Sequence, residues 1–144
     1  MLEAEFFIFC RGAQINADGI DFMRTQDTIF TTKFPTVVAY PLTVVSKLRV
    51  KKALSGDAIP YKVEIERNGE VVFSNSNKMP GRRVPKDGVV YFQADLQRVI
   101  LKEAGKYHVN LYMNDRKVIT RPLFGILMSD KDKLGEQEII QETH

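Results

Sequence analysis

Hydrophobic and polar residues alternate with a period of two along most of the chain, and Gly, Asn, Asp and Pro interrupt the pattern at short intervals. Successive side chains of a β-strand point to opposite faces of a sheet, so this rhythm indicates strands rather than helices. The pattern predicts eight strands, at residues 4–11, 20–29, 37–52, 61–67, 70–76, 88–96, 106–113 and 117–128. Eight strands separated by turn residues are typical of an all-β sandwich.

The clearest inward-facing positions are Val63 and Ile65, which alternate with charged residues, and the alternate residues of 107–113, which begin with Tyr107. Tyr107 follows a glycine-containing corner and an apolar segment at 96–101. This placement is typical of the tyrosine corner of immunoglobulin-like sandwiches. The chain has one cysteine and no tryptophan, which excludes an antibody-type domain. We therefore expect an immunoglobulin-like antiparallel β-sandwich of about seven to nine strands.

The Asn-Gly pair at 68–69 predicts a β-hairpin. A two-residue loop would leave Val71 and Phe73 in solvent, whereas a three-residue loop at 67–69 places them opposite Ile65 and Val63. A shift of one residue moves every side chain to the other face, so burial favours the three-residue loop, with its glycine in the left-handed conformation.

A second hairpin is expected at 114–115, where a two-residue loop would set Leu111 against Val118. The segment 97–104 is the one internal stretch whose pattern permits a helical turn, which would end at Gly105.

Length and charge are those of one ordinary globular domain. The 144 residues include 21 Lys and Arg against 18 Asp and Glu, a formal net charge of +3. A chain of this length can bury a conventional core without metals or disulfides. The N-terminus lacks a signal-peptide pattern and no apolar run is long enough to span a membrane, so we expect a cytoplasmic protein without a membrane role. We divide the chain into a β-sandwich domain at 1–128 and a polar C-terminal tail at 129–144, either disordered or a short docked helix.

Catalytic chemistry has few candidates. His108 alternates with apolar neighbours and is expected on the outer face of a strand, and His144 is the last residue. Cys10 ends an apolar run, where a buried structural thiol is favoured over a reactive one. Nucleotide-binding and hydrolase motifs are absent from the sequence, and its scattered Asp residues fit turns and caps better than a calcium site. We expect no enzyme activity, no cofactor and no metal.

Two basic features are candidate anion sites. Lys47, Arg49 and Lys51 recur at a period of two, with Lys52 beside them, and residues 62–66 could lie opposite and partly neutralise them. A solvated face of mixed charge is the simpler interpretation. The second feature is the loop 78–86, which holds four cations between turn residues: Lys78, Arg82, Arg83 and Lys86. Guanidinium groups suit phosphate, but the loop lacks aromatic residues that could stack on bases.

Two strands are apolar on both faces, at 6–9 and 123–128. A sandwich strand needs only one apolar face, so the second must be covered by the tail, by a loop or by another chain, unless it reflects local packing at strand ends. We expect the contacts to a protein partner at these strands, with two further residues at the rim. The candidate interface residues are Phe7, Phe9, Leu123 and Leu127, with Tyr112 and His108 at the rim.

A series of short motifs resembles a family of small bacterial and phage β-sandwich proteins catalogued only as a domain of unknown function. These motifs are Cys10, the segment 19–22, the Phe34-Pro35 step, the Asn68-Gly69 hairpin, and the segments 105–109 and 121–123. The resemblance covers about residues 5–128. It implies a fold and no activity, and it transfers no binding residues.

The sequence therefore favours a non-enzymatic β-sandwich that binds protein, with a homo-oligomer as one form of this function. The alternative hypothesis is an anion-binding or nucleic-acid-binding module that uses the basic loop at 78–86.

Overall fold

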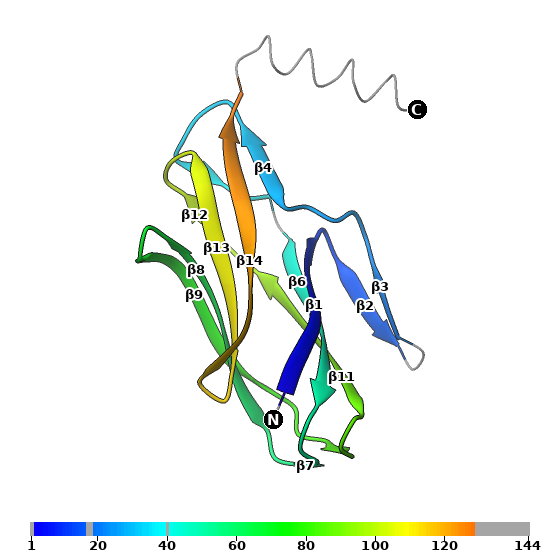
Figure 1. The fold of residues 1–144 in the computed structure, drawn as a ribbon. Coiled ribbons are helices and arrows are strands. Elements are labelled where there is room, and N and C mark those ends of the chain that lie inside the picture. Colours follow the sequence, from blue (N-terminus) through cyan, green and yellow to red (C-terminus); the bar gives the residue numbers. More distant parts are fainter. Residues whose placement is uncertain (1, 17–18, 40, 129–144) are drawn as a thin grey trace.

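The computed structural model, drawn in Figure 1, describes residues 2–16, 19–39 and 41–128. Within these residues the secondary structure is entirely β. The strands are β1 (Leu2–Cys10), β2 (Ala13–Asn16), β3 (Gly19–Phe22), β4 (Thr28–Thr31), β5 (Thr36–Val37), β6 (Leu42–Val50), β7 (Leu54–Ser55), β8 (Ile59–Arg67), β9 (Glu70–Met79), β10 (Arg83–Val84), β11 (Val89–Leu96), β12 (Ile100–Leu101), β13 (Gly105–Met113) and β14 (Arg116–Leu127). The predicted tail at 129–144 lies outside the described residues.

Two sheets form the sandwich, one of three strands in the order β1-β6-β11 and one of five in the order β4-β14-β13-β8-β9 (Figure 1). After β6 the chain crosses to the larger sheet for β8 and β9, returns for β11, and crosses again for β13 and β14. These crossings are Greek-key connections of the immunoglobulin type. The pairs between long strands are antiparallel, and β4 pairs with β14 in parallel. The predicted immunoglobulin-like sandwich is confirmed.

The core lies between the sheets and contains the inward residues that the alternation predicts. Val63, Ile65 and the alternate residues of β13 are all at most 2% exposed. On the other sheet, β6 is the central strand, between β1 and β11, and it is buried along most of its length. Its buried polar residues are hydrogen-bonded, with Thr43 donating to Asp95 at 2.7 Å and Ser46 to the Phe6 carbonyl at 2.7 Å.

The tyrosine corner is present at the entry to β13. The buried Tyr107 hydroxyl donates to the Glu103 carbonyl at 2.5 Å and accepts a hydrogen bond from the Glu103 amide at 3.3 Å. The Arg67 guanidinium lies 5.7 Å from the centre of the Tyr107 ring and forms an ion pair with the Glu103 carboxylate. These contacts join the turn before β13 to the end of β8.

The β8–β9 loop is shorter than predicted. Arg67 pairs with Glu70, so the loop contains only Asn68 and Gly69, at φ of 52° and 80°. Two successive residues with positive φ define a type I′ turn, whose twist matches that of the flanking strands. The predicted three-residue loop is therefore wrong.

A register shift in β9 nevertheless brings Phe73 opposite Ile65. The shift follows the pair formed by Glu66 and Val71, and it is a β-bulge that inserts one extra residue into β9. Phe73 consequently packs against the core, whereas Val71 is 48% exposed. The register that buries Phe73 is thus set by a bulge within β9 and not by the length of the loop.

The β13–β14 hairpin has the predicted two-residue loop, since Met113 pairs with Arg116. Leu111 pairs with Ile119 rather than with the predicted Val118, because a register shift follows Leu111. Both Val118 and Ile119 are partly buried against the core.

Three predicted segments differ from the observed strands. The strand expected at 20–29 is divided into β3 and β4, because Arg24 adopts a left-handed conformation and Thr25 bridges to Cys10. The long strand expected at 37–52 is reduced to β6, and β5 is separate. The segment 97–104 has no helical turn: it contains β12, which pairs with β5, and the Val38 amide donates to the Val99 carbonyl at 2.8 Å.

Tyr107→Phe tests the corner. The substitution keeps the ring and removes the hydroxyl that joins both backbone groups of Glu103. We expect the free energy of unfolding to fall by about 1 kcal/mol, the typical contribution of one hydrogen bond. Urea denaturation followed by circular dichroism measures the change. Tyr112→Phe is the matched control, because the Tyr112 hydroxyl makes no hydrogen bond to the described residues. Equal stability of the two variants would contradict the role of the corner.

Candidate functional site

Three of the residues predicted as protein contacts are core residues. Phe7, Phe9 and Leu123 are 4%, 5% and 0% exposed and belong to the main hydrophobic cluster. Each occupies an inward position of its strand, so the apolar sequence around it does not place it on the surface. The prediction that these three side chains contact a partner is therefore corrected. The apolar residues on both faces identified these segments as strands, but they did not show which face is exposed.

The other predicted contact residues lie in different places. Leu127 is 55% exposed, at the end of β14. His108 is half-buried on the outer face of β13, as predicted, and pairs with Pro122 and Glu66. Tyr112 is half-buried. The centre of its ring lies 4.4 Å from Lys62 Nζ and 5.9 Å from Lys117 Nζ.

An apolar patch occupies the outer face where β4 meets β14. Phe30 pairs directly with Ile126, and these side chains are 49% and 41% exposed. Phe124, half-buried, lies two residues earlier on the same face of β14. We call these three residues the outer patch. Sequence reasoning missed Phe30 because the strand predicted there ended at residue 29, although Ile29-Phe30 repeats the signal of adjacent apolar residues seen in β14.

The buried Asn110 lies on the same outer face, between His108 and Tyr112 along β13. It is 1% exposed, and its amide nitrogen and oxygen have no hydrogen-bond partner among the described residues. The centre of this face thus has a buried polar residue. This polar position lies between the outer patch and the other end of the sheet.

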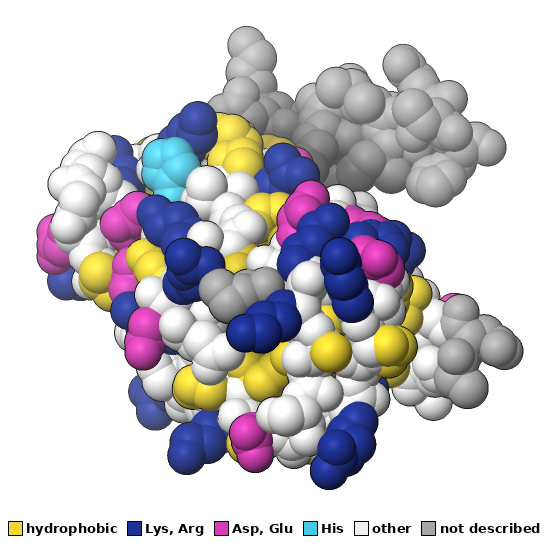
Figure 2. Space-filling view, turned by 60° about the horizontal axis from the view of Figure 1, so that its bottom comes forward, with side chains coloured by type: hydrophobic (Ala, Val, Ile, Leu, Met, Phe, Trp, Pro, Cys, Tyr) yellow, Lys and Arg dark blue, Asp and Glu magenta, His cyan; other side chains and the backbone are white. Residues whose placement is uncertain are grey.

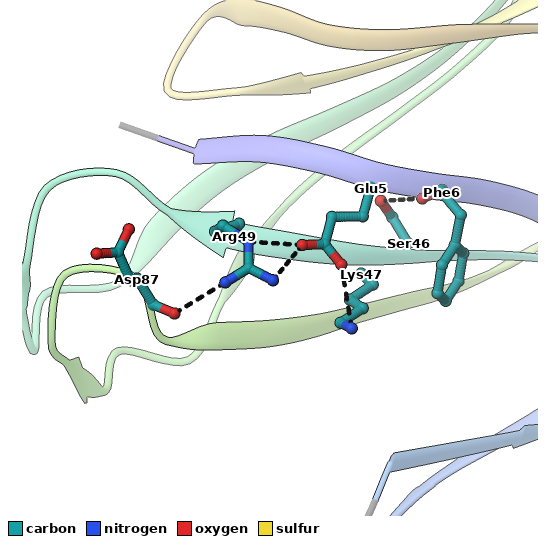
Figure 3. A network of polar contacts seen from close by, with 6 residues as sticks. All are labelled: Glu5, Phe6, Ser46, Lys47, Arg49 and Asp87. Carbon is teal, nitrogen blue, oxygen red and sulfur yellow. Dashed lines mark hydrogen bonds and ion pairs between the residues drawn. The ribbon is translucent and has the colours of Figure 1, made fainter.

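The stripe of cations on β6 is neutralised by acids of β1, not by residues 62–66. Figure 3 shows the Glu5 carboxylate between Lys47 and Arg49. Lys47 Nζ lies 3.0 Å from Glu5 Oε2, and Arg49 Nε donates to Glu5 Oε1 at 2.6 Å. Lys51 pairs with Glu3 at 3.1 Å. The expected neutralisation by residues 62–66 is wrong because β6 lies in the other sheet, beside β1.

A β-bulge explains how one carboxylate reaches two cations. The register of β1 against β6 shifts between Ala4 and Phe6, so Glu5 is the extra residue. Hydrogen bonds from Lys47 and then Arg49 lower the pKa of the Glu5 carboxyl. The stripe is therefore a salt-bridged face, as the simpler interpretation held, and it is not a free anion site.

The four cations of the loop at 78–86 are exposed, and none forms an ion pair with a described residue. Their backbone is partly ordered by sheet pairing, since Arg83 pairs with Ser55 of β7. Figure 2 shows basic side chains spread across this end of the molecule, with hydrophobic side chains among them.

A groove opens at the same end of the sandwich, with a volume of about 550 Å³. It lies between the start of β1, the β6–β7 turn and the β13–β14 hairpin. Its lining combines apolar side chains with Lys52, Arg116 and Lys117. None of these three cations was singled out for this site from the sequence, because the segments that carry them are more than sixty residues apart.

The remaining candidates form no site in the described part of the chain. Cys10 is fully buried, its thiol lies 3.4 Å from the Gly12 carbonyl, and burial raises its pKa. These properties fit the structural thiol that the sequence predicts. No group of three or more His, Cys, Asp or Glu among the described residues is arranged to hold a metal ion. No described segment is a helix able to cross a bilayer.

Comparison with known proteins identifies a family and a fold. A family model described as a family of unknown function, DUF6941, matches residues 5–124. No curated protein matches the chain. The structure resembles part of the alkylpurine DNA glycosylase AlkC of Pseudomonas fluorescens, solved bound to DNA containing an abasic site analog, with a TM-score of 0.51, 7% identity and coverage of 86% of this chain.

The chain spans only 30% of the length of that glycosylase chain, and at 7% identity the likeness shows the fold alone. An immunoglobulin-like protein from Pseudomonas aeruginosa aligns with a TM-score of 0.38 and 9% identity, over 88% of this chain and 97% of the other.

Glu5→Gln tests the salt-bridged face. The folded-state pKa of Glu5 is lowered, so its stabilising contribution is present above the unfolded-state pKa of about 4.3 and is lost as pH falls through the folded-state pKa. We expect the variant to lose less stability than the wild type between neutral pH and pH of about 3, as measured by urea denaturation at each pH.

Glu3→Gln is the matched control, because it removes the same charge from the more exposed pair with Lys51. A Glu5→Gln variant with the same pH dependence as the wild type would refute the contribution of Glu5.

Proposed function

The chain belongs to DUF6941, a family of unknown function, and we propose that it is a non-enzymatic module that binds a second copy of itself. The proposed contact is the outer patch of Phe30, Phe124 and Ile126. The observation that carries the proposal is the direct pairing of Phe30 with Ile126 on an outward face, where both side chains are exposed. Large apolar side chains gathered on an outer sheet face mark interaction surfaces.

The geometry of the patch suits two-fold symmetry. In a two-fold interface each contact occurs twice, because residue i of one subunit touches residue j of the other and the reverse. Phe30 of one subunit can pack on Ile126 of the second, and Ile126 of the first on Phe30 of the second. One row of two apolar residues thus supplies both halves of the contact.

The charges beside the patch also permit pairing with an identical surface. Lys106 pairs with Phe124 across the β13–β14 ladder, and Glu66 pairs with His108 in a neighbouring row. The face therefore carries a cation and an acid at different distances from the apolar centre. A second copy can place its Glu66 near Lys106, whereas surfaces of a single charge sign would repel.

The expected association is weak. Fully burying a Phe or Ile side chain stabilises by about 1.5–3 kcal/mol, and about half of each is already covered in the single chain. The four side chains of a dimer then contribute roughly 4 kcal/mol before rim contacts are counted. A net free energy of about that size corresponds to a dissociation constant of about 1 mM, which we expect if the rim contacts offset the translational and rotational entropy that association costs.

The test is a double variant, Phe30→Thr with Ile126→Thr, in which threonine preserves β-strand propensity. We expect the wild type to shift from its monomer mass of 16.5 kDa toward twice that mass as concentration rises, and the variant to stay monomeric. Sedimentation equilibrium measures the mass, and circular dichroism checks that both proteins remain folded.

Val71→Thr is the matched control, because Val71 is also apolar and 48% exposed but lies on β9. It should associate as the wild type does. A wild type that remains monomeric at millimolar concentration, or a double variant that associates normally, refutes the proposal.

The second candidate function is nucleic-acid binding by the basic loop, favoured by four exposed cations without ion pairs in the described part of the chain. If Arg82 and Arg83 contact phosphates, retention of single-stranded DNA on a filter will fall steeply with salt. Replacing both by Gln will lower the slope of log affinity against log salt by about 1.4. Absence of retention even at low salt would dispose of this function.

A further inference from the structure

The groove beside the β13–β14 hairpin combines an apolar floor with a basic rim. Strand ends and turns from three parts of the chain form it. The residues that line it are Leu2, Glu3, Lys52, Ala53, Leu54, Met113, Asn114, Arg116, Lys117 and Val118. Its volume of about 550 Å³ lies within the range of sites for small molecules, which are mostly apolar with a few polar groups.

The rim carries uncompensated positive charge. Lys52, Arg116 and Lys117 form no ion pair with any described residue, and Lys117 Nζ lies 5.9 Å from the centre of the Tyr112 ring. Glu3 is the one acid among the lining residues, and it is already paired with Lys51 at 3.1 Å. The residues that line the groove thus include three cations and no free carboxylate. Low-dielectric walls strengthen such a field.

The floor offers apolar surface that a ligand can cover. Leu2, Leu54 and Val118 are half-buried side chains that pack against the core and reach the groove. Leu54 is held by the pairing of β7 with β10, where it lies opposite Val84. A hydrated anion such as inorganic phosphate would leave this floor uncovered, whereas a neutral apolar molecule would leave the cations unused.

We propose that the groove binds a phosphate monoester that carries an apolar body, such as an alkyl chain. The phosphate lies at the rim, where the Arg116 guanidinium can bind two oxygens at once and Lys52 and Lys117 act as point charges. The apolar body lies on the floor formed by Leu2, Leu54 and Val118. A dianion matches three cations better than a single carboxylate does.

The groove and the outer patch lie at opposite ends of β14, at Arg116 to Val118 and at Phe124 to Ile126. This inference is therefore independent of self-association. Groove variants should show the same molecular mass in solution as the wild type at each concentration. The Phe30→Thr, Ile126→Thr variant should still bind the ligand.

The probe is decyl phosphate below its micelle-forming concentration, titrated into the full chain by isothermal calorimetry. Inorganic phosphate and a neutral decyl glycoside separate the contributions of charge and of the apolar body. We expect decyl phosphate to bind at least about tenfold more tightly than either. Each control lacks one kind of contact, and the loss of a single good contact lowers the affinity by about a factor of ten. Equal binding of inorganic phosphate would overturn the proposal.

The rim is tested by Lys52→Gln with Arg116→Gln. Two partly exposed charge contacts together account for about a tenfold loss of affinity. Arg98→Gln with Lys102→Gln is the matched control, because it removes the same charge from exposed residues at the other end of the sandwich. An equal loss in both variants would show only a general effect of net charge and would overturn the rim assignment.

The floor is tested by filling the groove. Ala53→Trp places a large side chain in the lining, whereas Ala104→Trp adds the same side chain to an exposed turn at the other end. We expect the first to abolish binding and the second to leave it unchanged. Circular dichroism confirms that each variant is folded. Undiminished binding by the folded Ala53→Trp protein would place the ligand elsewhere and overturn the proposal.

Discussion

The structure depends on the double-sided burial of β6. This strand is hydrogen-bonded to β1 on one edge and to β11 on the other, and most of its side chains are buried. A strand in this position must find a partner for every polar group, and it does. Ser46 donates to the Phe6 carbonyl, Thr43 donates to Asp95, and the outward Lys47 and Arg49 share the carboxylate of Glu5. The bulge in β1 falls at Glu5 and places its carboxylate between these two cations.

In the larger sheet, the strand β14 is only partly covered by a neighbour on one edge, and the two candidate sites lie at its two ends. The twelve-residue strand β14 pairs with β13 from Arg116 to Gly125 but with β4 only over its last four residues. Where β4 covers its edge, the ladder sets Phe30 beside Ile126 on the outer face. Where β4 is absent, the start of β14 lines the groove with Arg116, Lys117 and Val118. A short edge strand thus determines where apolar surface and charge remain available.

Much of the fold was predictable because burial imposes a period of two. The inward face of β13, the tyrosine corner and the two-residue loop at 114–115 follow from local residue types. The register could not be predicted in the same way, since each bulge adds one residue without a sequence signal of its own. Val71 and Phe73 show this: the expected loop would bury both, but the bulge buries only Phe73.

The sequence by itself determined the class of the fold, the strands of the core and the turns, because alternation and positive-φ turn residues are local properties. Only the tertiary structure decided which face of an apolar strand is covered. It placed Phe7, Phe9 and Leu123 inside and left Phe30 and Ile126 outside. It also decided that Glu5, rather than residues 62–66, neutralises the β6 cations, and that Lys52 meets Arg116 at one groove. These outcomes depend on which strands become neighbours, and that choice is made by long-range packing of both sheets at once.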